Sequence, residues 1–75
     1  SKANGLVRLC EYYGMDISQT IAFGDSMNDY EIVRAAGTGI AMGNSVKQLK
    51  DAADYVTDDV DQDGIWNACR HFGWI

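Results

Sequence analysis

The sequence predicts an α/β fold: a three-stranded parallel sheet with flanking helices, in the order α-β-α-β-α-β-α. Three short apolar runs show almost no polar alternation, which is typical of strands that are buried on both faces. Segments with helical spacing of apolar residues separate these runs, and such alternation favours right-handed crossovers and a parallel sheet. The 75 residues make one small domain, and a chain of this size buries only roughly 60% of its unfolded surface.

The first predicted helix begins at an Asn4 cap and ends at Gly14, a residue type suited to the left-handed turn after a helix. Apolar residues recur along this helix at i, i+3, i+4 and i+7, so we expect one inward stripe. The stripe consists of Leu6, Leu9, Cys10 and Tyr13.

The middle of the chain predicts a strand, a helix and a second strand. The helix carries three inward-facing apolar residues and stops at Gly37, which can end a helix. The predicted ranges are 20–23 for the strand, 29–36 for the helix with Ile32, Val33 and Ala36 inward, and 38–42 for the second strand.

The last part of the chain predicts a helix capped by Ser45, a third strand, an acidic loop and a final helix. Serine is a favoured residue at a helix N-terminus, because its hydroxyl accepts a free backbone N–H. The predicted ranges are 46–53 for the helix, 54–57 for the strand, 58–64 for the loop and 64–72 for the last helix, with Trp66, Phe72 and Trp74 as core and interface cover.

Composition narrows the possible partners. The net charge of −5 argues against nucleic acid and anionic membranes as partners, and no apolar stretch reaches the ~20 residues of a membrane span. Cys10 and Cys69 lie in apolar helical patterns, so we expect buried free thiols and a cytoplasmic, reducing environment. The chain starts at Ser1 without a signal-peptide pattern, so we expect it to be processed or cut from a longer protein.

The segment from Ile21 to Asp29 is the strongest candidate for a functional site. Its apolar run stops at Gly24, and Asp25, Asn28 and Asp29 follow where a helix begins. Ligands of open parallel sheets bind at the carboxyl ends of the strands, and Mg²⁺ prefers oxygen ligands with positions left for water and phosphate. Helix capping explains one of these acids but explains two neighbouring carboxylates poorly. A metal or phosphate site and a capped helix therefore stay open as interpretations.

Lys2 is a second candidate, because a lysine beside a phosphate supplies a compact positive charge. The spacing of residues does not distinguish this role from that of a solvated surface lysine.

Two other motifs give weaker predictions. The run from Asp59 to Gly64 matches the opening of a helix–loop–helix calcium loop, but its twelfth position is Arg70 instead of glutamate. The favoured interpretation is a solvated acidic loop, with Asp63 near the N-terminus of the last helix. The run from Gly37 to Gly43 resembles a dinucleotide fingerprint only loosely, because Met42 stands where the third glycine belongs.

Taken together, these segments resemble the C-terminal part of a haloacid dehalogenase (HAD) superfamily phosphatase of the Cof type, subfamily IIB. The resemblance covers nearly the whole chain, in the family's order, and implies part of a Rossmann-like core. It depends on the segments 1–6, 21–31, 35–37, 39–44 and 52–57.

The resemblance implies a role for each candidate residue. Lys2 matches a catalytic lysine that contacts the phosphate and the nucleophilic aspartate, and Asp25 matches the catalytic acid that holds Mg²⁺. Asp29 matches a second acid that supports the metal site, and Asn28 matches a residue that contacts the phosphate. The implied reaction is hydrolysis of a small phosphorylated metabolite, such as a sugar phosphate, through an aspartyl-phosphate.

The sequence also departs from the family. It contains no Asp-x-Asp-Gly-Thr motif to supply the nucleophile, and the second-motif Ser/Thr and the substrate-selecting cap domain are absent from these 75 residues. We therefore expect residues 1–75 to be the C-terminal part of a phosphatase core and to be inactive alone. The alternatives are a non-catalytic module that self-associates through sheet edges and apolar patches, and a small calcium-binding module at 59–64.

Overall fold

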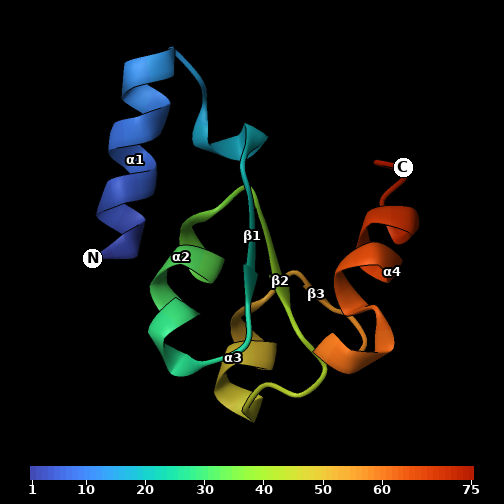
Figure 1. The fold of residues 1–75 in the computed structure, drawn as a ribbon. Helices are drawn as coiled ribbons and strands as arrows, with labels where there is room; N and C mark the ends of the chain where they lie inside the picture. Colours follow the sequence, from blue (N-terminus) through green and yellow to red (C-terminus); the bar gives the residue numbers. More distant parts are fainter.

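The computed structural model describes all of residues 1–75 and has one parallel sheet, whose strands lie side by side in the order β1-β2-β3 (Figure 1). The strands are β1 Ile21–Gly24, β2 Thr38–Ala41 and β3 Tyr55–Val56. Phe23 is the partner of Ile40 and Gly24 that of Ala41. The predicted α/β class and the parallel sheet are confirmed, and each predicted strand is present with its ends moved by at most one residue.

Four α-helices and three single 3₁₀ turns connect and flank the strands. Their order with the strands agrees with the predicted alternation. The helices are α1 Lys2–Tyr13, α2 Tyr30–Ala35, α3 Lys47–Ala52 and α4 Gly64–His71, and the 3₁₀ turns are η1 Ile17–Gln19, η2 Met27–Asp29 and η3 Val60–Gln62.

A side chain caps the N-terminal end of α1, and a backbone N–H caps its C-terminal end. The hydroxyl of Ser1 accepts a hydrogen bond from the N–H of Asn4 at 3.3 Å, so Ser1 is the cap and the predicted Asn4 cap is wrong. At the other end, Gly14 has φ of 66° and donates its N–H to the carbonyls of Cys10 and Glu11. A glycine adopts this left-handed conformation without the steric cost of a Cβ, and the predicted stop at Gly14 is confirmed.

The start of α3 also differs from the prediction. Its N-cap is Val46, which makes no side-chain capping bond, whereas Ser45 lies one residue earlier. The Ser45 hydroxyl is buried and donates to the carbonyl of Gly24 at 3.4 Å, so a tertiary contact replaces the predicted helix cap. The helix predicted over 29–36 is likewise divided into η2 and α2.

The core lies where α2 and α3 cover the sheet. Val33 on α2, Ile40 on β2 and Leu49 on α3 are the largest fully buried side chains. Gly39 lets α2 come close, because a Cβ added at this residue would lie 1.9 Å from the carbonyl oxygen of Val33. A residue with any side chain at 39 would therefore force α2 away from the sheet.

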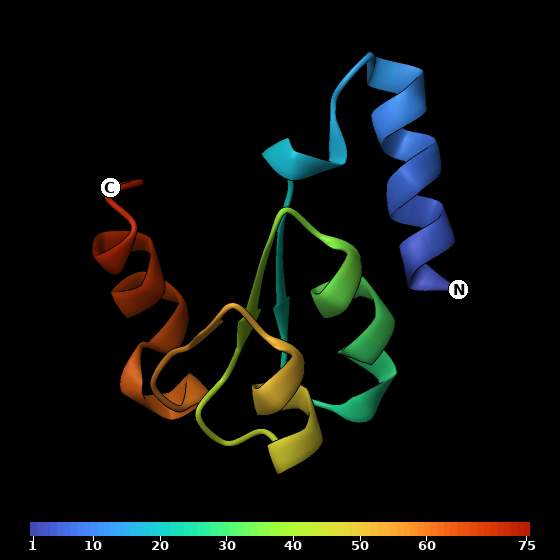
Figure 2. The same cartoon turned by 180° about the vertical axis from the view of Figure 1, so that it is seen from behind.

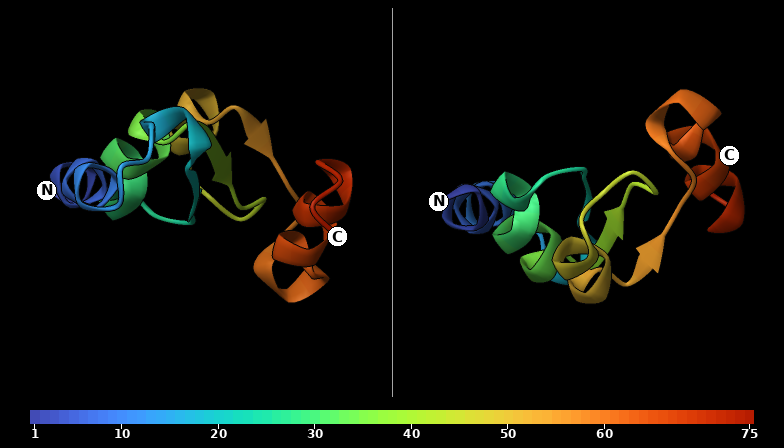
Figure 3. Two further views of the ribbon diagram at one scale, coloured as in Figure 1. Left: turned by 90° about the horizontal axis from the view of Figure 1, so that it is seen from above. Right: turned by 90° about the horizontal axis from the view of Figure 1, so that it is seen from below.

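The inward stripe predicted for α1 is wrong in two of its four members, because Leu9 and Tyr13 are exposed whereas Leu6 is half-buried. Cys10 is buried, but Leu9 is 57% exposed and Tyr13 67% exposed. The helix packs mainly against α2, with further contacts to η1, and lies outside α2 at one end of the molecule (Figure 3). Helical periodicity showed the apolar side of α1, and the structure leaves most of that side uncovered.

The C-terminal helix α4 lies at the opposite end of the molecule from α1 (Figures 1 and 2). Tyr55 of β3 stacks on His71 with ring centroids 4.1 Å apart, and Phe72 meets Tyr55 edge-on at 5.3 Å. Trp74 stacks on Phe72 at 4.7 Å. This aromatic cluster, made of Tyr55, His71, Phe72 and Trp74, holds the end of α4 beside the sheet.

Both cysteines are free thiols; the predicted burial is confirmed for Cys10, whereas Cys69 is only half-buried. None of the helices combines the length and the apolar character that crossing a membrane requires.

Candidate functional site

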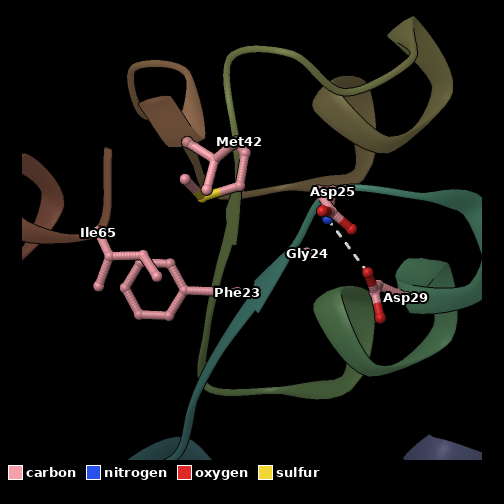
Figure 4. A pocket seen from close by; sticks show the side chains of 7 residues that line it. Phe23, Gly24, Asp25, Asp29, Met42 and Ile65 are labelled. Carbon is pink, nitrogen blue, oxygen red and sulfur yellow. Dashed lines mark hydrogen bonds between the residues drawn. The ribbon is translucent and has the colours of Figure 1, made fainter. Parts of the chain in front are cut away.

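The candidate site lies at the carboxyl end of β1, where the chain turns from the strand into η2 and α2. Gly24 is the last residue of β1, Asp25 follows it directly, and Asn28 and Asp29 belong to η2. Figure 4 shows Asp25 and Asp29 close together at this turn. The structure therefore brings the three predicted oxygen-bearing side chains to one loop.

Gly24 is required for this turn because another side chain approaches it closely. A Cβ added at this residue would lie 2.7 Å from Cβ of Asp29 and 2.8 Å from Cγ2 of Val33. Gly24 is buried, and its missing side chain leaves the space in which Asp29 folds back over the end of the strand. The glycine thus sets the position of the neighbouring carboxylate.

Asp29 connects the groups of the site. Its Oδ1 accepts a hydrogen bond from Nζ of Lys2 at 2.7 Å, and the two groups form an ion pair. Its Oδ2 accepts the backbone N–H of Asp25 at 3.1 Å and that of Ser26 at 3.4 Å. Lys2 is 27 residues away in sequence, and Asp29 therefore joins the start of α1 to the loop after β1.

The electrostatics of Asp29 follow from these partners. The hydrogen bond from Lys2 lowers the pKa of the Asp29 carboxyl below its usual range; partial burial opposes this shift, and the N–H groups of Asp25 and Ser26 add to it. Donors that bind the charged form of a carboxylate stabilise that form. Asp29 is thus held as an anion that accepts hydrogen bonds through both oxygens.

Asp25 and Asn28 differ from Asp29 in being exposed at this edge of the sheet. Their side chains offer a carboxylate and an amide oxygen, which are hard donors of the kind that Mg²⁺ binds. Mg²⁺ is usually held by one or two carboxylates together with waters and phosphate oxygens, instead of a complete protein cage. The exposed carboxylate of Asp25, with Asp29 behind it, fits that kind of partial coordination.

A hollow of about 210 Å³ adjoins these groups. Asp25 and Asp29 line it together with Gly24, and apolar residues complete its wall (Figure 4). The apolar residues are Phe23, Met42, Val60 and Ile65. A small polar molecule at Asp25 would therefore have an apolar surface close by.

The carboxylates of the acidic loop, residues 58–64, are not gathered around one point in this structure. Nowhere in residues 1–75 do three Asp, Glu, His or Cys side chains converge as metal ligands would. The Oδ2 of Asp58 accepts a hydrogen bond from Asn67 of α4 at 2.8 Å, and Asp63, with φ of 60°, is the N-cap residue of α4 but makes no side-chain capping bond. The loop thus serves α4, and the element before it is a strand, as predicted.

The segment from Met42 to Ser45 contacts the site, which sequence reasoning missed. The N–H of Met42 donates to the carbonyl of Gly24 at 2.8 Å, and Ser45 donates to the same oxygen. The sequence shows Ser45 only as a helix-capping residue type. No local pattern indicates that its hydroxyl turns towards a strand end 21 residues earlier.

Two curated relatives from Bacillus subtilis cover the whole chain. The protein YkrA is 48% identical over 75 residues, and 5-amino-6-(5-phospho-D-ribitylamino)uracil phosphatase YcsE is 40% identical over 75 residues. In both comparisons the chain spans 29% of the relative's length.

Solved structures of phosphatases are also similar to this chain. The HAD subclass IIB sugar phosphatase BT4131 is 41% identical with a TM-score of 0.97, and the match covers 100% of this chain and 29% of that one. The 3-deoxy-D-manno-octulosonate 8-phosphate phosphatase from Moraxella catarrhalis, solved with magnesium and phosphate ions, is 36% identical with a TM-score of 0.70, covering 75% of this chain and 32% of that one.

The family comparison covers most of the chain and includes every candidate site residue. Residues 1–69 match the haloacid dehalogenase-like hydrolase family. Together with the fold and the loop after β1, this match confirms the resemblance seen in the sequence. The chain belongs to the haloacid dehalogenase-like hydrolase family and is similar to HAD subclass IIB phosphatases.

Proposed function

We propose that this chain supplies the lysine and the metal-side acid of a Mg²⁺-dependent phosphatase that acts on a small phosphorylated metabolite, such as a sugar phosphate. The observation that carries the proposal is the pair of contacts made by Asp29. One carboxylate oxygen binds the ammonium of Lys2, and the other accepts the backbone N–H of Asp25. These contacts bring the ammonium of Lys2 and the backbone of Asp25 to the carboxylate of Asp29.

The proposed roles are those that the family resemblance implies, and the placement of Lys2, Asp25 and Asp29 at one strand end supports them. Asp25, exposed at the strand end, would hold Mg²⁺, with Asp29 supporting that site from behind. Lys2 and Asn28 would contact the phosphate, where positive and hydrogen-bonding groups offset its charge. When bound, Mg²⁺ would neutralise the charge that develops on the phosphoryl oxygens.

The reaction would proceed in two displacements. An aspartate carboxylate attacks phosphorus, the bond from phosphorus to the ester oxygen breaks, and the leaving alcohol takes a proton from a neighbouring acid. Water then gives a proton to that same neighbouring carboxylate and attacks phosphorus, the acyl-phosphate bond breaks, and inorganic phosphate leaves with the aspartate carboxylate restored. Residues 1–75 contain no Asp-x-Asp-Gly-Thr motif for the first step, and we propose that they form the C-terminal part of the phosphatase core and are inactive alone.

A magnesium titration tests the proposed metal site. We expect the ¹H–¹⁵N NMR signals of residues 25–29 to shift with added Mg²⁺ and Asp25→Asn to remove the response. Asp51→Asn is the matched control, since Asp51 is an exposed carboxylate on α3, whose partner is Lys47. If the wild-type signals stay unchanged at tens of millimolar Mg²⁺, or if Asp25→Asn responds equally, the proposed metal role is wrong.

A phosphatase assay tests the proposed inactivity of the isolated chain. We expect no release of phosphate from sugar phosphates above background with Mg²⁺ present, because the carboxylate that attacks phosphorus is not supplied. Turnover that the substitution Asp25→Ala abolishes would contradict this expectation and would mean that residues 1–75 contain a complete catalytic site.

A further inference from the structure

The loop between β2 and α3, residues 42–46, touches both neighbouring loops at the carboxyl edge of the sheet. On one side, Met42 N–H and the Ser45 hydroxyl donate to the carbonyl of Gly24, at 2.8 and 3.4 Å. On the other side, the N–H of Gly43 donates to the carbonyl of Asp58 at 3.2 Å. The loop therefore bridges the turn that carries Asp25 and the acidic loop after β3.

The peptide that joins Gly24 to Asp25 is held from both ends. Its carbonyl accepts hydrogen bonds from Met42 and Ser45, and its N–H donates to Oδ2 of Asp29 at 3.1 Å. A peptide group is planar, so fixing both of its polar ends also fixes the position of the Asp25 Cα, from which the side chain leaves. Ser45, a residue that is 8% exposed, thus helps to hold the peptide from which Asp25 continues.

On its second side, the loop of residues 42–46 binds Val60, which lines the hollow. The Oδ1 of Asn44 accepts the N–H of Val60 at 3.1 Å, and Val60 lines the hollow beside Asp25. The two loops come close because residue 43 is glycine: an added Cβ would lie 2.5 Å from Oδ1 of Asp59 and 2.9 Å from the carbonyl of Thr57. Asn44 therefore holds the backbone of Val60, and with it the part of the apolar lining that Val60 forms.

We propose that Asn44 and Ser45 are positioning residues of the candidate site: Ser45 orients the Gly24–Asp25 peptide, and Asn44 fixes Val60 at the wall of the hollow. The proposal rests on the proposed function, because it deepens the geometry of that same site. Neither residue needs to touch substrate or metal. Each acts through one hydrogen bond to the backbone of a residue that lines the hollow.

The first test measures the two backbone groups without metal, in the 75-residue chain. We expect Asn44→Ala to speed hydrogen exchange of the Val60 amide about fivefold, the effect of losing one ordinary hydrogen bond. Asn44→Asp keeps the accepting oxygen and should stay near the wild type. Ser45→Ala should move the ¹³C signal of the Gly24 carbonyl and the amide signal of Asp25, and Ser45→Thr, which keeps the hydroxyl, should restore both.

The second test uses Mg²⁺ alone as the probe. We expect Ser45→Ala to weaken Mg²⁺ binding, followed at the amide of Asp25, by roughly tenfold, the low end for a residue that orients a metal ligand. Ser45→Thr should recover most of the affinity. Gln48→Ala, an exposed change on α3, is the control that should alter neither test.

The outcomes separate this proposal from the proposed function. If both alanine variants leave the Val60 and Gly24–Asp25 signals unchanged, or if the conservative variants differ from the wild type as much as the alanine variants do, the positioning roles are wrong. If the wild-type chain shows no response to Mg²⁺, the proposed metal role fails, while the exchange and carbonyl signals still decide the positioning roles. Unchanged amide signals of α1 in each variant show that the chain has kept its fold.

Discussion

At the scale of single residues, the site is organised by Asp29. The sequence identified Lys2, Asp25, Asn28 and Asp29 as candidates, and the structure places them at one strand end. Which acid accepts the lysine could not be predicted, because the fold of α1 back onto α2 decides it. The pattern of residue types after β1 predicted the composition of the site, whereas the partners of each oxygen depend on tertiary contacts.

We predict that Lys2→Met raises the pKa of Asp29 towards the ordinary value of an aspartate. The hydrogen bond from Lys2 is the largest cause of the lowered pKa, and the two backbone donors will keep part of the shift. A ¹³C NMR titration of the Asp29 carboxyl measures this change. Lys47→Met is the matched control, because Lys47 forms an equally short pair with Asp51 and does not contact Asp29.

The same shift predicts how stability depends on pH. A carboxyl whose pKa is lower in the folded chain contributes stability that is present above its unfolded pKa and is lost as the pH falls through its folded pKa. The wild type should therefore exceed Lys2→Met in unfolding free energy by the largest amount near neutral pH. This difference should shrink below about pH 4. A difference that stays constant down to pH 2 would contradict the role of the Lys2–Asp29 pair.

We also predict that Gly24→Ala destabilises the chain by about 1–3 kcal/mol, the range for overpacking a buried position. The added methyl would collide with Asp29 and Val33, so the carboxylate must leave the end of β1. Gly5→Ala is the matched control: its Cβ meets nothing within 4 Å, and the change should stabilise α1 by about 0.5–1 kcal/mol. Urea unfolding measures both, and equal effects of the two changes would show that Gly24 is not required.

At the scale of secondary-structure elements, the strands were easier to predict than their neighbours. Apolar runs placed β1, β2 and β3 within two residues, since a strand buried between helices has few polar positions. The cap of α3 was mispredicted because Ser45 contacts Gly24 across the sheet, and α1 was mispredicted as a well-covered helix. Both errors have one cause: local patterns show what a segment prefers, and tertiary packing decides which groups meet.

We predict that α4 opens before the sheet does. Within the chain, α4 contacts mainly η3 and the aromatic cluster, whereas β2 is bonded to strands on both sides. Tyr55→Leu should further loosen α4, by about 0.5–1.5 kcal/mol from the lost ring contacts. Hydrogen exchange measures this opening at the amides of residues 68–72. Tyr12→Leu is the control, because Tyr12 is 81% exposed and its ring meets only Tyr13; equal protection of α4 and β2 would contradict the prediction.

At the scale of the whole molecule, the chain has more apolar surface than its core can use. It extends over 34 × 27 × 17 Å, and 14 of its 75 residues are buried. Fifteen large apolar side chains are exposed: on α1, on the outer strands, on α4 and the residues that follow it, and in the connecting loops and 3₁₀ turns. Chains of this size have little stability to spare, so the exposed surface and the small core together favour contacts with other apolar surfaces.

We therefore predict that the isolated chain self-associates, as the alternative function for this sequence also requires. Burial of apolar surface drives association in spite of the net charge of −5, and any species that binds only the folded chain raises the unfolding midpoint with concentration. Sedimentation equilibrium between about 10 and 500 µM should show the mass rising above 8.3 kDa, with a parallel rise in the unfolding midpoint. Leu9→Lys and Trp66→Lys lie at opposite ends of the molecule, and each replaces an exposed apolar side chain with a charge. A variant whose surface forms the contact between copies should associate less strongly than the wild type. A monomer with a concentration-independent midpoint over this range would contradict the prediction, and would mean that the exposed apolar residues are tolerated as ordinary surface.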